Sequence, residues 1–445
     1  MASNEGASEG SKLAKAMKSV SPVLLRSKKQ SVVNRLAVGL LAGVAFTCIL
    51  FSTCCLGAPE LPPAPPLLKL PINQPEGRRA FHDSLKLNQS KKGPWGQFEY
   101  YEVLLEAPIS VLKTAEISSF RSVWYFQKTT SVQVKELLEE MDLPSELEAN
   151  ILRPARWMES DGVVSIHVDR EILEQIPNKA RLSLYQKLSE CGLNRLHVEP
   201  EVVFAETANE WLQGYDFSEE LLRFVELTCY LRGECLVFSD VLEALKICRS
   251  EDERLRFRQA LSRTPSVVAN LFLSSAPTRE LASYWGQGIR FKNTLPFLES
   301  ISRVPGVEKV DLIHLLPAGV RKILYTFPNP LISENGYLPD CHWTSLNFFN
   351  VEPLERLSDP VQATQYTLEN FVVVDPPYRC GDVLFFADLK TGDAYHSCAY
   401  VADDIVLTKN GRSPLQPWVL MKMDHVKTIY DLHFRTKLVA YRRKG

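Results

Sequence analysis

The chain of 445 residues carries almost no excess charge, since 51 Lys and Arg stand against 53 Asp and Glu and the formal net charge is −2. Proteins that hold nucleic acid usually present a basic excess to the phosphates. We therefore exclude nucleic acid as a partner. Metal-ligand spacing is lacking too, because no two cysteines stand as C-x-x-C or in a comparable pattern. The sequence implies no zinc site, and it implies no other metal or cofactor.

Charge is absent from one long run, residues 36–57 (LAVGLLAGVAFTCILFSTCCLG). About 20 apolar residues are enough for a helix to span a bilayer. Ahead of this run, seven Lys and Arg oppose two Glu, and such a basic arm holds an N-terminus in the cytoplasm. We expect a basic cytoplasmic arm at 1–35, a transmembrane anchor at 36–57, and export of everything that follows.

Two other interpretations of this run stay open. A cleaved signal peptide fits the small residues Gly57 and Ala58 that follow the apolar stretch. A lipoprotein would use Cys54 or Cys55, although Phe51, which lies just ahead of them, departs from a lipobox.

Composition divides the rest of the chain into three parts. Residues 58–94 form a proline-rich linker, because proline fixes φ and favours an extended spacer. Residues 95–308 are predicted to be mainly helical, with apolar residues at three- and four-residue steps, and their function is not indicated. From 309 to 445 the pattern turns to short strands at 383–386, 395–401 and 405–408, with a tight turn at Asp403 and Asp404. This mixture predicts an α+β fold.

Seven cysteines lie beyond the apolar run, and an odd number leaves at least one thiol unpaired within the exported part. Cys341 differs from the others in its surroundings. Asp340 is a good N-cap, so Cys341 falls in the first turn of a helix. The partial positive charge there favours the thiolate, which is the nucleophilic form.

A cysteine nucleophile needs a base, and His396 heads the predicted strand 395–401. A third polar group should orient the imidazole. Thr408 and Asn410 both follow on the partner strand, and the sequence does not decide between them. His342 is adjacent to the cysteine, but consecutive helical residues point about 100° apart. We therefore expect its ring to point away from the thiol.

The order of these features resembles the NlpC-type papain-like cysteine hydrolases. Asp-Cys at a helix start is followed by Gly-Asp-Val-Leu-Phe-Phe at 381–386 and by a His-headed hairpin at 396–404. The similarity spans about a fifth of the chain, 325–408. The resemblance implies that 309–445 is a papain-like domain in which a Cys-bearing helix packs on an antiparallel sheet.

The resemblance also implies roles and a substrate. Cys341 would be the nucleophile, His396 the base and Thr408 the third polar group, with Asn410 as the alternative. A family tyrosine would fall near Tyr325. Family members cleave amide bonds in bacterial cell-wall peptides, so we expect a single-pass protein of the inner membrane with its bulk in the periplasm.

Two departures from the family keep further functions open. The small pair that usually follows the family cysteine is replaced by His342 and Trp343, and the third position is a threonine. One alternative is an inactive papain-like domain in an envelope protein whose helical region binds a partner. Another is an amidase or acyltransferase that acts on a non-wall substrate. The sequence indicates neither the scissile bond nor the oligomeric state.

Overall fold

The structure, a computed structural model, describes residues 86–114, 120–233, 235–329, 338–431 and 436–444. Its helices and antiparallel sheets confirm the predicted α+β class. The arm, the apolar run and the linker up to residue 85 lie outside the described residues. Among the helices that are described, none has the length and apolar character needed to cross a membrane.

The largest sheet has six antiparallel strands in the order β11-β16-β12-β13-β14-β15. Its strands are β11 (Phe371–Val374), β12 (Val383–Asp388), β13 (Ala394–Ala402), β14 (Ile405–Thr408), β15 (Val419–Lys422) and β16 (Thr436–Arg443). The three strands predicted in this part are confirmed within one or two residues. Alternate residues of β13 enter two different cores, since side chains along a strand point to opposite faces.

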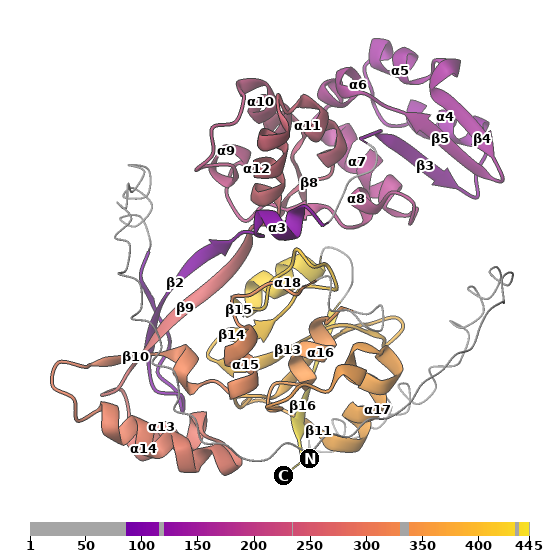
Figure 1. The fold of residues 1–445 in the computed structure, drawn as a ribbon. Helices are drawn as coiled ribbons and strands as arrows, with labels where there is room; N and C mark the ends of the chain where they lie inside the picture. Colours follow the sequence, from indigo (N-terminus) through magenta and orange to yellow (C-terminus); the bar gives the residue numbers. More distant parts are fainter. Residues whose placement is uncertain (1–85, 115–119, 234, 330–337, 432–435, 445) are drawn as a thin grey trace, which may run out of the picture. The chain divides into compact units, whose positions relative to one another are not determined.

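Helices cover both faces of this sheet. They are α16 (Cys341–Leu346), the short turn η5 (Glu355–Ser358), α17 (Pro360–Asn370) and α18 (Met423–Asp431). Residues of α16 and α17 share one core with Val383 and Phe385, and Val426 of α18 belongs to another core with Leu384 and Phe386. Figure 1 shows α16 beside β13, and these two elements are in contact.

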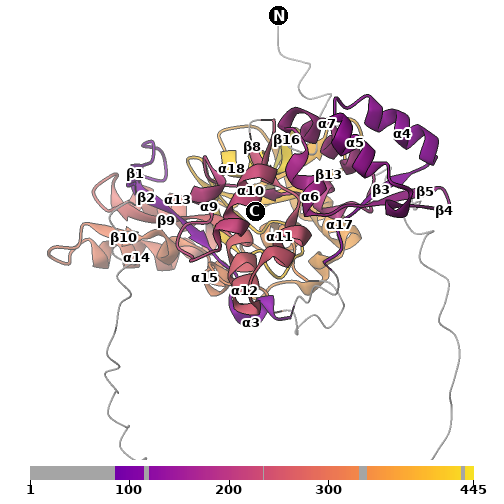
Figure 2. The ribbon, with the colours of Figure 1, turned by 90° about the horizontal axis from the view of Figure 1, so that it is seen from above.

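A second sheet is built from strands far apart in the sequence. β2 (Phe98–Leu105) pairs along its whole length with β9 (Thr264–Phe272), as Figure 2 shows. β1 (Asn88–Gln89) and β10 (Lys309–Asp311) complete it. The elements that follow β9 are α13 (Thr278–Trp285), η3 (Gly288–Arg290), α14 (Phe291–Ile301), η4 (Leu312–Leu315) and α15 (Ala318–Ile323). Their apolar side chains share a core with β13 and β14.

Residues 106–263 form an insertion between the paired strands β2 and β9, with a core of its own. It contains strands as well as the predicted helices, because short runs rich in Val, Ile and aromatic residues favour sheet. Its elements are α3 (Ile109–Leu112), β3 (Val123–Gln127), α4 (Ser131–Glu139), α5 (Ser145–Ile151), η2 (Pro154–Arg156), β4 (Trp157–Ser160), β5 (Val163–His167), α6 (Arg170–Gln175), α7 (Asn178–Ser189), α8 (Arg195–Val198), β6 (Glu201–Val202), α9 (Ala208–Trp211), α10 (Glu219–Thr228), β7 (Tyr230–Arg232), β8 (Cys235–Phe238), α11 (Val241–Ile247) and α12 (Glu251–Leu261).

The Gly-Asp-Val-Leu-Phe-Phe segment has a structural explanation. Gly381 adopts a φ of 86°, and an added Cβ would lie 2.2 Å from the ring of Phe349. Asp382 is buried and accepts two hydrogen bonds from Arg442, at 2.8 and 2.7 Å. The glycine therefore lets Phe349 lie close to the start of β12, and the buried carboxylate ties this start to Arg442 of β16.

Candidate active site

Cys341 begins helix α16, and the predicted cap at Asp340 is confirmed. The Asp340 carboxylate accepts a hydrogen bond from the backbone N–H of Trp343 at 2.9 Å. The same carboxylate accepts from Nε of Arg412 at 3.2 Å. The thiol-bearing residue is 5% exposed. The first turn of α16 thus holds Cys341 at a fixed and nearly buried position.

His396 lies on β13 and is completely buried. Its ring stacks on Tyr430 of α18, with centroids 4.0 Å apart and an angle of 21° between the planes. Nε2 of His396 lies 3.1 Å from the Thr408 hydroxyl. Among the described residues, Nδ1 has no hydrogen-bond partner. His396 nevertheless acts on Cys341, since it helps to lower the pKa of that thiol.

The two candidates for the third position lie at different distances from the imidazole. Thr408 contacts the ring directly, and its hydroxyl donates to Oδ1 of Asn410 at 3.5 Å. The Asn410 amide nitrogen lies 3.9 Å from the Met421 sulfur. The structure therefore brings Cys341, His396 and Thr408 together, with Asn410 one hydrogen bond further from the thiol.

His342 contradicts the expectation that its ring points away from the thiol. Its side chain hydrogen-bonds Cys341. Nδ1 lies 2.8 Å from the Ser397 hydroxyl, and the ring stacks on Phe385 at a centroid distance of 5.7 Å. These contacts from β12 and β13 turn the ring back toward the helix start. No local pattern signals them, because they depend on how the sheet packs under α16.

The charges around the thiol favour its ionised form. Burial opposes a thiolate at Cys341, but attraction and hydrogen bonds from His342 and His396 hold its pKa well below the usual value. Burial also opposes a charge on His342, yet the neighbouring thiolate raises the pKa of His342 to about 8. Lys409 is buried nearby, and desolvation lowers its pKa to about 8.

A groove of about 1280 Å³ meets the thiol. Cys341, Tyr395 and Tyr430 line it from the sheet side, and residues of the insertion line it opposite. Basic side chains outnumber acidic ones along it; they are Arg195, Arg232, Arg258, Arg263 and Arg412 against Glu199 and Glu201. Burial and the nearby Glu199 raise the pKa of Glu201 to about 7. Arg263 and Arg412 are ion-paired with Glu106 and Asp340, so the excess of basic charge along the groove is small.

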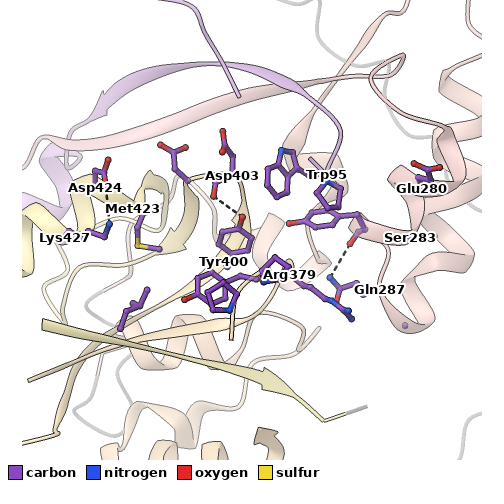
Figure 3. A pocket seen from close by; sticks show the side chains of 18 residues that line it. Trp95, Glu280, Ser283, Gln287, Arg379, Tyr400, Asp403, Met423, Asp424 and Lys427 are labelled. Carbon is purple, nitrogen blue, oxygen red and sulfur yellow. Dashed lines mark hydrogen bonds and ion pairs between the residues drawn. The ribbon is translucent and has the colours of Figure 1, made fainter. Parts of the chain in front are cut away.

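A second cavity, of about 1210 Å³, has none of the four predicted site residues in its lining. Figure 3 shows Trp95 and Tyr400 on its walls beside Asp403, with Arg379 also lining it. The Tyr400 hydroxyl donates to the Asp403 carbonyl at 2.9 Å.

Tyr325, the residue near which a family tyrosine was expected, has a structural hydrogen bond, since its hydroxyl donates to the Val267 carbonyl at 2.7 Å.

Cys380 and Cys398 are free thiols, and both are buried. Burial raises the pKa of Cys380 to about 12 and that of Cys398 well above its usual value. Within the described residues, no cluster of His, Cys, Asp or Glu has an arrangement that suits a metal ion. Cys341 is thus distinguished from its neighbours by two adjacent imidazoles.

Comparisons with family models, curated proteins and solved structures find no match to this chain.

Proposed function

We propose that the chain is a cysteine hydrolase that cleaves amide bonds through a thioester on Cys341. The observation that carries this proposal is the contact of one buried thiol with His396 and His342, with Thr408 against the far nitrogen of His396. A structural cysteine gains nothing from such neighbours, whereas a nucleophile needs them to remain a thiolate at neutral pH.

The proposed reaction has two halves. The Cys341 thiolate attacks the carbonyl carbon, and the backbone N–H of Cys341 donates to the oxyanion. His396 gives a proton to the departing amine, which leaves a thioester. Water then attacks the thioester, His396 takes the proton of that water, and the carboxylic acid leaves as the thiolate is restored. Thr408 accepts from Nε2–H of His396 and keeps Nδ1 directed at the reacting atoms.

The substrate class that we propose is a peptide of the bacterial cell wall. The likeness of the motifs to the NlpC-type papain-like hydrolases supports this class. The small excess of basic charge in the groove is consistent with it, because wall peptides carry free carboxylates. An acyltransferase would use the same thioester with another acceptor in place of water.

Digestion of purified wall peptides tests the proposal. Wild type should release new amino termini and carboxylates from peptidoglycan fragments, and Cys341→Ala should release none. Matched Cys191→Ala, which removes a buried thiol of the insertion, should keep full release. Equal release by wild type and Cys341→Ala would contradict the proposal. Tight binding of the fragments without any cleavage would instead favour a binding protein.

We also propose that residues 36–57 anchor the chain in the inner membrane and place the groove outside the cytoplasm. The uncharged run and the basic arm before it support this proposal. The protein should stay in the membrane pellet after carbonate extraction. A protease added to spheroplasts should remove residues beyond 86 and leave the basic arm intact. Release of the protein by carbonate would contradict the anchor.

A further inference from the structure

A closed chain of hydrogen bonds links the side chain of His342 to its own backbone. Nδ1 of His342 lies 2.8 Å from Oγ of Ser397, and this oxygen lies 2.7 Å from Oγ of Ser345. The Ser345 hydroxyl donates to the His342 carbonyl at 3.3 Å. A carbonyl only accepts, so the direction of each bond is fixed. Ser397 donates to Ser345, and Nδ1–H of His342 donates to Ser397.

This direction decides which nitrogen of His342 is free to act as a base. With the proton held on Nδ1, the neutral ring has its lone pair on Nε2. Because Nδ1 is engaged by Ser397, the side-chain hydrogen bond with Cys341 falls to Nε2. The thiol therefore faces a nitrogen that can accept its proton.

We propose that His342, positioned by Ser397, is the base that takes the proton of the Cys341 thiol. The S–H bond breaks, an N–H bond forms at Nε2, and the products are a thiolate and an imidazolium. His342 keeps this proton while the thiolate reacts. His396 gives a separate proton to the leaving amine and regains one from the attacking water. This inference rests on the proposed function, since it concerns the same nucleophile.

One observation favours His342 over His396 for this step. The bonds that hold His342 are shorter, at 2.8 and 2.7 Å, than the 3.1 and 3.5 Å bonds that run from His396 through Thr408 to Asn410. Stacking fixes the plane of both rings, on Phe385 for His342 and on Tyr430 for His396, so it does not distinguish them. Short bonds and a fixed plane orient Nε2 at the sulfur.

The charged groups around His342 come from several elements. Asp340 at the start of α16 favours a positive ring, and the Cys341 thiolate does so more strongly. Arg412, from the segment after β14, opposes it. His396 and Lys409 interact electrostatically with Cys341. The positive ring of His342 thus rests on the thiolate first and on Asp340 second.

The pH dependence of iodoacetamide alkylation, followed at the Cys341 peptide by mass spectrometry, tests the inference. The full chain is compared as wild type, His342→Gln, His396→Gln and Ser397→Ala. Exposed His314 offers the matched control His314→Gln. His342→Gln should slow alkylation at pH 6 at least about tenfold, because the thiol loses the stronger of the two attractions that favour its thiolate. Ser397→Ala should slow it less, and Ser397→Thr should restore the wild-type rate.

The outcomes separate this inference from the proposed function. His396→Gln should slow alkylation at pH 6 less than His342→Gln does, and it should lose hydrolysis of wall peptides. If His396→Gln instead slows alkylation while His342→Gln leaves it unchanged, His342 is not the base and the inference fails alone. If wild-type Cys341 alkylates no faster at pH 6 than the other cysteines, both the inference and the proposed function fail. Circular dichroism of each variant establishes that the fold is retained.

Discussion

Thr408 and Asn410 are neighbours on one strand end, yet only Thr408 touches the imidazole of His396. From the sequence alone, both residues were candidates for the third polar group. A shift of one or two residues in the strand register would put one in the place of the other. The β13–β14 pairing sets this register, with Ala399 opposite Leu407. A hydroxyl is a weaker acceptor than a carboxylate, so its contribution to orienting His396 should be modest.

We expect Thr408→Val to reduce acylation of Cys341 about three- to tenfold, because one hydrogen bond contributes about 0.5–1.5 kcal/mol. The valine keeps the shape of the side chain and removes the oxygen that accepts from Nε2. Asn410→Ala should change the rate less than about twofold, since Asn410 contacts the hydroxyl and not the ring. The measurement is the rate of acylation by p-nitrophenyl acetate, read as a mass increase on the Cys341 peptide. A larger loss in Asn410→Ala would reverse the assignment.

Single residues also show how far this site can be predicted from the sequence. Asp340, Cys341 and the His396 strand carry local signals, namely a cap, a helix start and an alternating run. The partners of His342 carry none, because Ser397 and Phe385 meet its ring through the packing of β12 and β13 under α16. Side-chain direction in a first helical turn is decided by such tertiary contacts.

At the scale of elements, α16 is short and depends on its cap. Asp340 caps it, and Asp359 caps α17 by accepting from the N–H groups of Val361 and Gln362, both within 3.0 Å. The two aspartates are therefore a matched pair of helix caps, one beside the thiol and one at the start of α17.

We expect Asp340→Ala and Asp359→Ala each to lower the free energy of unfolding by about 1 kcal/mol, the usual cost of a lost N-cap. Only Asp340→Ala should also slow alkylation of Cys341, because it releases the first turn and removes a carboxylate that favours a positive His342. Urea unfolding and peptide-resolved alkylation measure the two effects. Equal alkylation rates in both variants would show that the cap has no effect on the thiol.

The elements differ in how well their sequences predict them. Three strands of the six-stranded sheet, β12, β13 and β14, follow from β-branched and aromatic runs, and their bounds agree with the structure within one or two residues. β2 and β9 fall in the part of the chain predicted to be mainly helical, so the sequence indicated neither these strands nor their pairing. Nothing local specifies a pairing that joins Phe98 to Leu271 across the whole insertion. Register between distant strands follows from the buried faces that they share.

At the scale of the whole molecule, the insertion has its own core and its own response to pH. His197 is buried in it, stacked edge-on against Tyr185 at 4.6 Å, with Nε2 unpaired among the described residues. Burial, with Arg181 and Arg232 nearby, lowers the pKa of His197 to about 3. The ring must stay neutral for the core to form.

The sign of this effect fixes the expected pH dependence of stability. The folded-state pKa of His197 lies below its unfolded value of about 6.5. Its contribution is therefore complete above pH 6.5 and is lost progressively as the pH falls toward 3. At pH 5 the loss amounts to about 2 kcal/mol relative to pH 7, at about 1.4 kcal/mol for each pH unit.

We expect His197→Phe to remove this acid sensitivity while it keeps the ring against Tyr185. Urea unfolding followed by tryptophan fluorescence at pH 7 and pH 5 gives the comparison, with exposed His314→Phe as the matched control. The difference between the two pH values should shrink by about 2 kcal/mol in His197→Phe only. An unchanged difference would mean that the ring gains a proton within the folded core.

The central claim is that Cys341 is an activated nucleophile, and its alkylation in the wild-type chain tests this most directly. Iodoacetamide is applied from pH 5 to pH 9, and the rate at each cysteine is read from its own peptide. We predict that Cys341 reacts at pH 6 at least about tenfold faster than Cys398 or Cys380, whose thiols are buried and protonated. A Cys341 rate that matches theirs at pH 6 and rises only near pH 8.5 would contradict the account.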